Sequence, residues 1–304
     1  MKFFVTGASG YIGGSVATRL VASGHAVVGL TRRADKAEEL KAQGIEPLVA
    51  ELDDAEALTK AARAADAVIN AASADHPGAV DTLLHALSRS GKLFIHTSGS
   101  AIVADDACGE ADEQAYSEDD YFEPVPFRLE RVEMNRRVRA AAIEDGVRGV
   151  VICPPTIYGE GLGLEKDSDQ IPKLMALSER QGAGLYLGRG LNRYSNVHIR
   201  DLVDLFELVI ETAPGGAFFF AENGEMSFRE IAEQIARVLG LPGVRSLDVE
   251  EVTRSFGPAA RYGLASNSRV RAVAARRLGW RPSAPSLREW FEALARQRAA
   301  VNAA

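Results

Sequence analysis

The stretch that decides the fold is Met1-Lys2-Phe3-Phe4-Val5-Thr6-Gly7-Ala8-Ser9-Gly10-Tyr11-Ile12-Gly13-Gly14. Residues 2–5 form a short apolar run typical of a buried strand, and apolar residues between 11 and 23 recur at helical spacing. Three glycines, at positions 7, 10 and 13, stand between the two. Glycines there let the backbone approach a pyrophosphate, which the positive end of the helix attracts. The sequence therefore predicts a dinucleotide site at the start of the first helix.

Composition restricts the classes of partner. The chain has 304 residues, of which 46% are apolar, and a formal net charge of -7. That charge argues against nucleic acid or an anionic membrane surface as the main partner. No apolar run approaches the length of a membrane span, and the chain enters a strand at once, so neither a membrane anchor nor a signal peptide is expected. Two cysteines without paired spacing favour a cytoplasmic protein.

The end of the second expected strand, residues 25–30, bears on the choice of dinucleotide. It is followed by Thr31-Arg32-Arg33. In a nucleotide-binding βαβ unit this position faces the adenosine ribose, where an acidic residue favours NAD. A guanidinium can instead pair with a 2′-phosphate. We therefore expect NADP(H) to be preferred, with NAD(H) possible; the alternative is that both arginines are solvated residues at the start of a helix.

Three segments carry a resemblance to a known family. Thr6-Gly7-x-x-Gly10-x-x-Gly13 resembles the glycine signature of the short-chain dehydrogenase/reductase superfamily. The segment 197–202, Val-His-Ile-Arg-Asp-Leu, and the segment 278–282, Leu-Gly-Trp-Arg-Pro, resemble later elements of its extended, epimerase/dehydratase-like and atypical branches. The resemblance implies an α/β fold with a Rossmann-type doubly wound parallel sheet of about seven strands. Residues 1–155 would bind the dinucleotide, with 195–213 returning to them, and 156–194 and 214–304 would bind the substrate.

Cofactor contacts follow from the resemblance and from the tendency of ligands to gather at the carboxyl ends of parallel strands. The expected dinucleotide-binding residues are Thr6, Gly7, Ser9, Gly10, Tyr11, Ile12, Gly13, Thr31, Arg32, Arg33, Glu51, Leu52, Asn70, Ala71, Ala72, Thr97, Ser98, Arg131, Pro154, Thr156 and Ile157.

The catalytic pattern of the superfamily is not matched. Its enzymes usually carry Tyr-x-x-x-Lys on the helix after the fifth strand, and aligning residues 131–138 with that helix places Phe127 at the tyrosine and Arg131 at the lysine. Phenylalanine has no ionisable proton, and arginine stays charged at neutral pH, although it could still hold a ribose or a phosphate. The usual serine position falls near Gly99. The expected catalytic residues are Tyr158, Ser98, Ser100 and Arg131, with Tyr121 and Tyr116 as further proton-donor candidates.

Three functions remain open at this stage. The first is an atypical reductase that uses NADPH to reduce a small carbonyl compound or an activated alkene. The second is a non-catalytic NADP(H) sensor of the NmrA type, and the third is a nucleotide-sugar epimerase or dehydratase, which needs the tyrosine most. Each implies a small-molecule partner, and the family implies a monomer or homodimer.

One segment and one histidine have two interpretations each. The segment 101–123 carries nine acidic residues and no lysine or arginine. It is interpreted as a solvated loop, with a lid that attracts a cationic substrate as the sharper alternative. His198, which lies in the second resembling segment, is interpreted as structural rather than catalytic.

Overall fold

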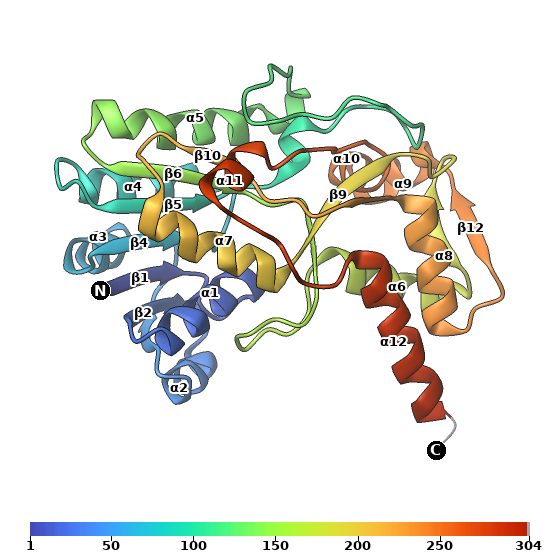
Figure 1. Cartoon of the computed structure of the whole chain (residues 1–304), viewed down its shortest axis with the longest axis horizontal. Coiled ribbons are helices and arrows are strands. Elements are labelled where there is room, and N and C mark those ends of the chain that lie inside the picture. The colour runs from blue at the N-terminus through green and yellow to red at the C-terminus, as the bar shows by residue number, and fades with distance from the viewer. Residues whose placement is uncertain (303–304) are drawn as a thin grey trace.

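A computed structural model, which describes residues 1–302, contains a central sheet of seven strands (Figure 1). Its order is β10-β6-β5-β4-β1-β2-β3, and every pairing is parallel. The strands are β1 (Lys2–Thr6), β2 (Ala26–Thr31), β3 (Glu46–Val49), β4 (Ala67–Asn70), β5 (Leu93–Thr97), β6 (Arg148–Cys153) and β10 (Phe218–Phe220). The order reverses between β1 and β4, the arrangement that defines a Rossmann-type fold. The predicted fold class is confirmed.

Helices cover both faces of this sheet because its strands are apolar on both sides. One face packs on α1 (Tyr11–Ala22), α2 (Ala34–Ala42) and α7 (Ile199–Thr212), and the other on α3 (Ala55–Ala64), α4 (Pro77–Leu87) and α5 (Leu129–Glu144). In β1, Phe3 and Val5 belong to the first core cluster, whereas Phe4 belongs to the second. Side chains of successive strand residues point to opposite faces, so one short apolar run supplies both cores.

The register of the strands gathers the polar residues at one edge of the sheet. Thr6 is opposite Asn70, and Asn70 is opposite His96. Thr97 follows His96 and is opposite Ile152, near the end of β6. The strand ends predicted to line a site therefore meet at the carboxyl edge.

The smaller part of the molecule lies beyond that edge, at the right of Figure 1. It contains a three-stranded sheet, in the order β11-β9-β7, and a two-stranded sheet, β12-β8. These strands are β7 (Thr156–Tyr158), β8 (Gly184–Leu187), β9 (Arg193–His198), β11 (Glu225–Ser227) and β12 (Val244–Leu247). The helices around them are α6 (Gln170–Gln181), α8 (Phe228–Leu239), α9 (Val249–Phe256), α10 (Pro258–Leu264) and α12 (Leu287–Asn302). Two short 3-10 turns, η1 (Ser100–Val103) and η2 (Pro126–Arg128), and helix α11 (Val273–Leu278) complete the order of elements.

The structure differs from the expected division of the chain at two points. Residues 214–304 were assigned to the substrate-binding part, but β10 pairs with β6 as the seventh strand of the central sheet. The returning segment splits as well, because β9 belongs to the small sheet while α7 packs on α1. The division of labour between cofactor and substrate parts stays a prediction.

The two later resembling segments meet in space. The backbone carbonyl of Asp201 accepts a hydrogen bond of 2.8 Å from the indole of Trp280. The Asp201 carboxylate accepts N–H bonds from Ser283 and Ala284. Asp201 thus fixes the C-terminal segment to the start of α7, while the side chain of His198 caps that helix by accepting the N–H of Arg200 at 3.1 Å. The structural role expected for His198 matches this geometry.

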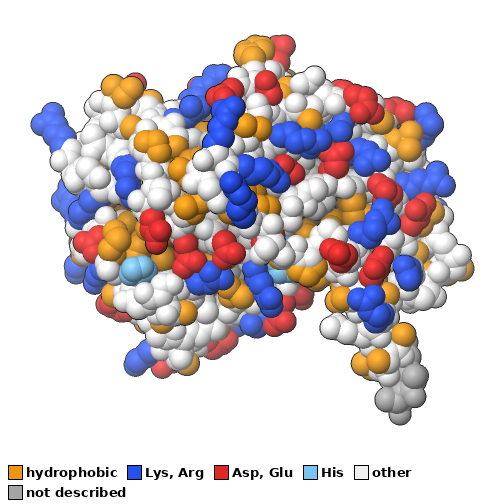
Figure 2. Space-filling model, in the orientation of Figure 1, with side chains coloured by type: hydrophobic (Ala, Val, Ile, Leu, Met, Phe, Trp, Pro, Cys, Tyr) orange, Lys and Arg blue, Asp and Glu red, His pale blue; other side chains and the backbone are white. Residues whose placement is uncertain are grey.

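The visible surface carries both signs of charge (Figure 2). Acidic and basic side chains are interspersed over most of this face, and basic side chains gather around α11. Within residues 1–302, no helix combines the length and the apolar character that crossing a bilayer requires.

Candidate active site

The glycine turn after β1 is packed against the loop that follows β4. The buried Thr6 hydroxyl donates to Asn70 Oδ1 at 2.6 Å and accepts the N–H groups of Ala71 and Ala72. Gly7 has φ +70°, and a Cβ there would lie 2.8 Å from the Ala72 Cα. A Cβ on Gly13 would lie 2.4 Å from the Gly7 carbonyl oxygen. Side chains are therefore excluded at both glycines by backbone atoms.

Helix α1 begins without a protein group over its N-terminus. Gly10 is its N-cap residue, no side chain caps it, and its first turn holds no acidic residue. The first N–H groups of a helix lack intrahelical acceptors, and the helix dipole adds partial positive charge. Bare backbone, free donors and positive potential fit the diphosphate of a nicotinamide dinucleotide, so Gly10, Tyr11, Ile12 and Gly13 are the residues that could hold it.

The adenosine end is marked by the end of β2. The Ser9 and Thr31 hydroxyls lie 3.1 Å apart, and this joins the glycine turn to β2. Arg33 pairs with Asp35 on the surface. Arg32 is exposed, and it makes no ion pair among residues 1–302. The structure thus leaves Arg32, rather than Arg33, available to a ligand.

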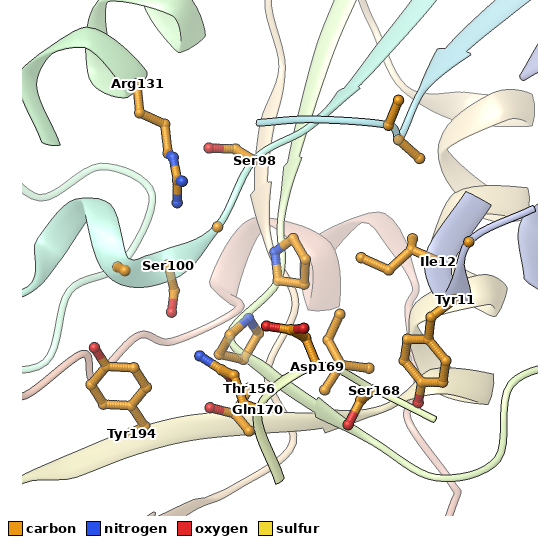
Figure 3. Close-up of a pocket in the computed structure, with 18 of the residues that line it drawn as sticks. Tyr11, Ile12, Ser98, Ser100, Arg131, Thr156, Ser168, Asp169, Gln170 and Tyr194 are labelled. Atoms are coloured by element: carbon orange, nitrogen blue, oxygen red, sulfur yellow. The ribbon is translucent and has the colours of Figure 1, made fainter. Parts of the chain in front are cut away.

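A cavity of about 520 Å³ lies between the carboxyl edge of the large sheet and the smaller part (Figure 3). It brings together many of the predicted residues. Its lining residues are Gly10, Tyr11, Ile12, Ala71, Ala72, Ser98, Gly99, Ser100, Ala101, Arg128, Arg131, Pro154, Pro155, Thr156, Ile157, Ser168, Asp169, Gln170 and Tyr194. Figure 3 shows Tyr11 and Ile12 at one end and Arg131 across the cavity from them.

Arg131 is held at its end of the cavity by Asp75. Its Nε donates to Asp75 Oδ1 at 2.6 Å, and Nη2 pairs with Oδ2. Its side chain is only 13% exposed. Nη1 lies 3.2 Å from where a Cβ on Gly99 would stand. The lack of a side chain at Gly99 therefore gives the guanidinium its room, and Nη1 remains as a donor toward the cavity.

Ser98 and Ser100 of the predicted set line the same cavity, and Figure 3 shows Ser98 directed toward Arg131. Ser98 Oγ accepts the Asn135 amide at 2.9 Å, so its own proton is left to donate, either to the buried Cys153 sulfur beside it or toward the cavity. Ser100 Oγ lies 2.8 Å from Ser268 Oγ. Ser98 is thus the better placed hydroxyl donor of the two.

The two phenols that line the cavity are committed to backbone carbonyls. Tyr11 donates to the Gly159 carbonyl at 2.8 Å, and Tyr194 donates to the Tyr262 carbonyl at 2.5 Å. Burial raises the pKa of Tyr194 to about 12 and raises the pKa of Tyr11 above its usual range. A phenol that donates to a carbonyl and resists ionisation is a poor proton donor to a substrate.

Tyr158, the first of the candidate proton donors, does not line the cavity. Its ring is fully buried outside the cavity, edge-on to His198 and close to Trp290. Its hydroxyl donates to the Pro285 carbonyl at 2.7 Å. Tyr116 and Tyr121 are not among the lining residues either, and Tyr121 is 85% exposed. These three tyrosines are therefore removed as candidates.

The remaining predicted residues either are buried beneath the cavity wall or lie away from the cavity. Asn70 is buried under the glycine turn, and Thr97 is buried at the end of β5. Leu52 is half-buried and Glu51 exposed, both just after β3, and neither lines the cavity. Phe127 also lies outside the lining, where its ring stacks on Tyr262 at 5.9 Å. The contacts expected of Glu51 and Leu52 with a dinucleotide stay predictions.

The segment 101–123 is neither a free loop nor a lid over the cavity. Glu118 accepts the backbone N–H groups of Val273 and Ala274 at the start of α11. Five of its other acidic residues bind basic or amide groups later in the chain, in the pairs Asp105–Asn267, Asp106–Arg261, Glu110–Arg189, Glu113–Arg269 and Asp119–Arg277. None of these carboxylates lines the cavity, so the cationic-substrate lid has no support.

Five polar or charged residues of the lining were not predicted from the sequence: Arg128, Ser168, Asp169, Gln170 and Tyr194. Ser168 and Asp169 come from the loop before α6, which has no sequence pattern, and Gln170 is the first residue of that helix. Arg128 did carry a signal, because three-residue spacing from Arg131 places both side chains on one side of the chain.

A buried histidine completes the support of the glycine turn. The Asn70 amide donates to His96 Nδ1 at 3.1 Å, so a chain of polar contacts runs from Thr6 through Asn70 to His96. Burial, with a further contribution from the charge of Arg131, lowers the pKa of His96 from 6.5 to about 4. A protonated His96 could no longer accept this bond.

This pKa shift predicts loss of stability in mild acid. The neutral form is favoured in the folded state, so stability is complete above the unfolded pKa of 6.5 and falls as the pH drops toward about 4. The shift corresponds to about 3 kcal/mol. Urea midpoints across this range should fall for the wild type and less steeply for His96→Asn. The exposed His85→Asn is the control, and equal slopes for both variants would contradict the prediction.

Comparison with known proteins shows which family this chain resembles. Residues 3–219 match the model of the NAD dependent epimerase/dehydratase family. The chain is 32% identical over 340 residues to the oxidase ucsJ of an Acremonium species, with coverage of 98% of this chain and 97% of the relative. It is 28% identical to the 2-alkyl-3-oxoalkanoate reductase of Stenotrophomonas maltophilia, with coverage of 80% and 77%.

A solved structure agrees with the fold. The dTDP-glucose 4,6-dehydratase DesIV of Streptomyces venezuelae, solved with NAD and TYD bound, superposes with a TM-score of 0.77 and 21% identity over 97% of this chain and 96% of that one. At this identity the likeness supports the fold alone. The family match covers well over half of the chain, and the reductase named among its relatives supports an oxidoreductase role. The chain therefore belongs to the NAD dependent epimerase/dehydratase family, a nicotinamide-dinucleotide-dependent branch of the short-chain dehydrogenase/reductase superfamily.

Proposed function

We propose that this protein is an NADPH-dependent reductase of a small carbonyl compound or activated alkene, in which Arg131 replaces the usual tyrosine acid as the group that polarises the substrate. The observation that carries the proposal is the guanidinium held by Asp75 over Gly99, with Nη1 as a donor toward the cavity. A bound reduced nicotinamide would supply the hydride.

The chain's own residues stabilise the charge that develops during reduction. The carbonyl carbon accepts the hydride, the C=O π pair moves to oxygen, and that oxygen finally takes a proton from water. Arg131 Nη1 and the Ser98 hydroxyl donate hydrogen bonds to the oxygen as it becomes negative. Such preorganised donors act most strongly in a site shielded from water. Asp75 and Asn135 keep these two donors in place through the bonds they make with them.

A panel of aldehydes, ketones and enones tests the proposal. Purified protein with NADPH should show substrate-dependent loss of the absorbance of the reduced nicotinamide for at least one class. The panel should be run with NADH in parallel. Absence of turnover with every class, despite tight NADP(H) binding, would overturn the proposal.

One observation favours a second candidate, a non-catalytic NADP(H) sensor. The two cavity phenols are committed to backbone carbonyls, and the Ser100 hydroxyl lies against Ser268. No side chain of the cavity, among the residues that the structure describes, combines a free phenol or imidazole with access to a ligand. Tight binding without turnover, with a change in the shape of the protein between its complexes with the oxidised and the reduced dinucleotide, would support this candidate.

The epimerase or dehydratase function ranks last because it needs an acid-base group in the cavity. Binding of a sugar nucleotide would favour it again.

Arg32 carries the proposed preference for NADP(H). Its side chain is exposed beside the end of β2, whereas Arg33 is occupied by Asp35. We expect Arg32→Ala to weaken NADPH binding by roughly 10- to 100-fold, because a charge-assisted contact to the 2′-phosphate is lost, and to leave NADH binding unchanged. Calorimetric titration with both dinucleotides measures this. Lys41→Ala, at the far end of α2, is the control; equal losses for NADPH and NADH would refute the assignment.

A further inference from the structure

The end of the cavity opposite α1 holds a second arginine. Arg128, the last residue of η2, lines the cavity together with Arg131. Its guanidinium carbon lies 4.7 Å from the centre of the Phe127 ring. Its Nε is buried and has no hydrogen-bond partner within residues 1–302. Nor does Arg128 form an ion pair with any carboxylate of that described part of the chain.

The charges at this end do not balance. Asp75, whose side chain is 57% exposed, forms an ion pair with Arg131, and within residues 1–302 it forms none with Arg128. Asp169, the acidic residue of the lining, pairs with Lys173. Burial and the charge of Arg131 lower the pKa of Arg128, and the smaller opposing effect of the Asp75 carboxylate does not offset them. Leaving a half-buried charge unpaired is costly, and an anionic ligand would remove that cost.

The position of this charge separates it from the diphosphate site. Figure 3 shows Arg131 across the cavity from Tyr11 and Ile12, where the start of α1 already provides donors for phosphates. An anion at Arg128 would therefore belong to the substrate. Since Arg128 and Arg131 are three residues apart on the same side of the chain, that anion would lie next to the group that Arg131 polarises.

Resting on the proposed function, we propose that the substrate is an oxo acid, with a carboxylate within a few bonds of the reducible carbonyl. Arg128 binds the carboxylate, and its fork of donors matches the two carboxylate oxygens. Arg131 faces the carbonyl. The pair thus selects anionic carbonyl compounds over neutral ones of the same shape, the opposite of the cationic preference considered for the acidic segment 101–123.

Matched substrates test the selectivity. Pyruvate against methyl pyruvate, and acetoacetate against methyl acetoacetate, compare a charged with a neutral carbonyl compound. At least one acid should exceed its ester in kcat/KM by 10-fold or more. Arg128→Met should lower kcat/KM for that acid by roughly 10- to 100-fold, mainly through KM, and should lower it far less for the ester. Arg128→Lys should restore part of the loss, and the exposed Arg136→Met should change neither.

A binding measurement separates this inference from the proposed function. Butyrate, which cannot be reduced, is titrated by calorimetry into wild-type protein saturated with NADP+ and into Arg128→Met. Binding that Arg128→Met abolishes supports the inference even if no carbonyl compound is turned over. Turnover of neutral carbonyl compounds, with equal use of acids and esters and no butyrate binding, would overturn the inference and leave the proposed function standing.

Discussion

Replacing Arg131 by methionine is expected to reduce kcat for carbonyl reduction by roughly 100- to 1,000-fold, the usual effect of removing a preorganised donor from a developing oxyanion. Methionine fills much of the space of the arginine stem and lacks its charge. Asp75, which loses its partner, is more than half exposed and can be solvated. We therefore expect the fold to survive and the change to be confined to the chemical step. Single-turnover rates with saturating NADPH measure it.

Dinucleotide affinity decides between two roles for Arg131. The resemblance to the superfamily also allows this residue to hold a ribose or a phosphate of the cofactor. If Arg131 polarises the substrate, NADPH binding should change by less than about 3-fold in Arg131→Met, while kcat falls. A large loss of NADPH binding with little change in kcat would assign it to the cofactor instead. The double variant Arg131→Met with Asp75→Asn removes both charges. It shows whether the unpaired Asp75 carboxylate contributes to the loss of kcat in Arg131→Met.

The sheet and the glycine turn could be predicted from sequence because local pattern determines them. The run Phe3-Phe4-Val5 is apolar on both sides, which only a strand buried between two helical layers tolerates. Gly13 is required because a Cβ there would meet backbone atoms of Thr6 and Gly7 in the same local unit, whereas Gly7 is also confined by the backbone of Ala71 and Ala72 after β4. The spacing of the glycines nevertheless stands within one short stretch of sequence, so it could be recognised without the rest of the chain.

The substrate end of the cavity could not be predicted in the same way. It is assembled from Arg128, Ser168 to Gln170 and Tyr194, which come from η2, the start of α6 and β9 and are far apart in sequence. Tyr158 shows the difficulty. It belongs to the three-residue strand β7, which is too short for alternation to reveal its direction, and its ring is packed with Trp290 from the last helix. The direction of that ring depends on its contact with a residue more than a hundred positions later in the chain.

Gly10→Ala is expected to weaken NADP(H) binding on the order of 100-fold, about 2.7 kcal/mol, while the protein remains folded. Gly10 lines the cavity and is the N-cap residue of α1. A Cβ there would meet only the Gly7 carbonyl oxygen, at 3.3 Å, a contact that a small shift relieves. The added methyl group would instead occupy the space through which a diphosphate approaches the helix N-terminus. Thermal unfolding and calorimetric titration of the same sample separate folding from binding.

The neighbouring glycines provide the contrast. Ala at Gly7 would combine φ +70° with a Cβ 2.8 Å from backbone, and Ala at Gly13 would press within 2.4 Å of a carbonyl oxygen, so both changes should destabilise the fold itself. Gly78→Ala in α4 meets nothing closer than 3.8 Å and should change neither property. If Gly10→Ala binds NADP(H) as tightly as Gly78→Ala does, the diphosphate does not lie at the start of α1. The placement of the whole cavity relative to the cofactor would then have to be abandoned, including the roles proposed for Arg131 and Arg128.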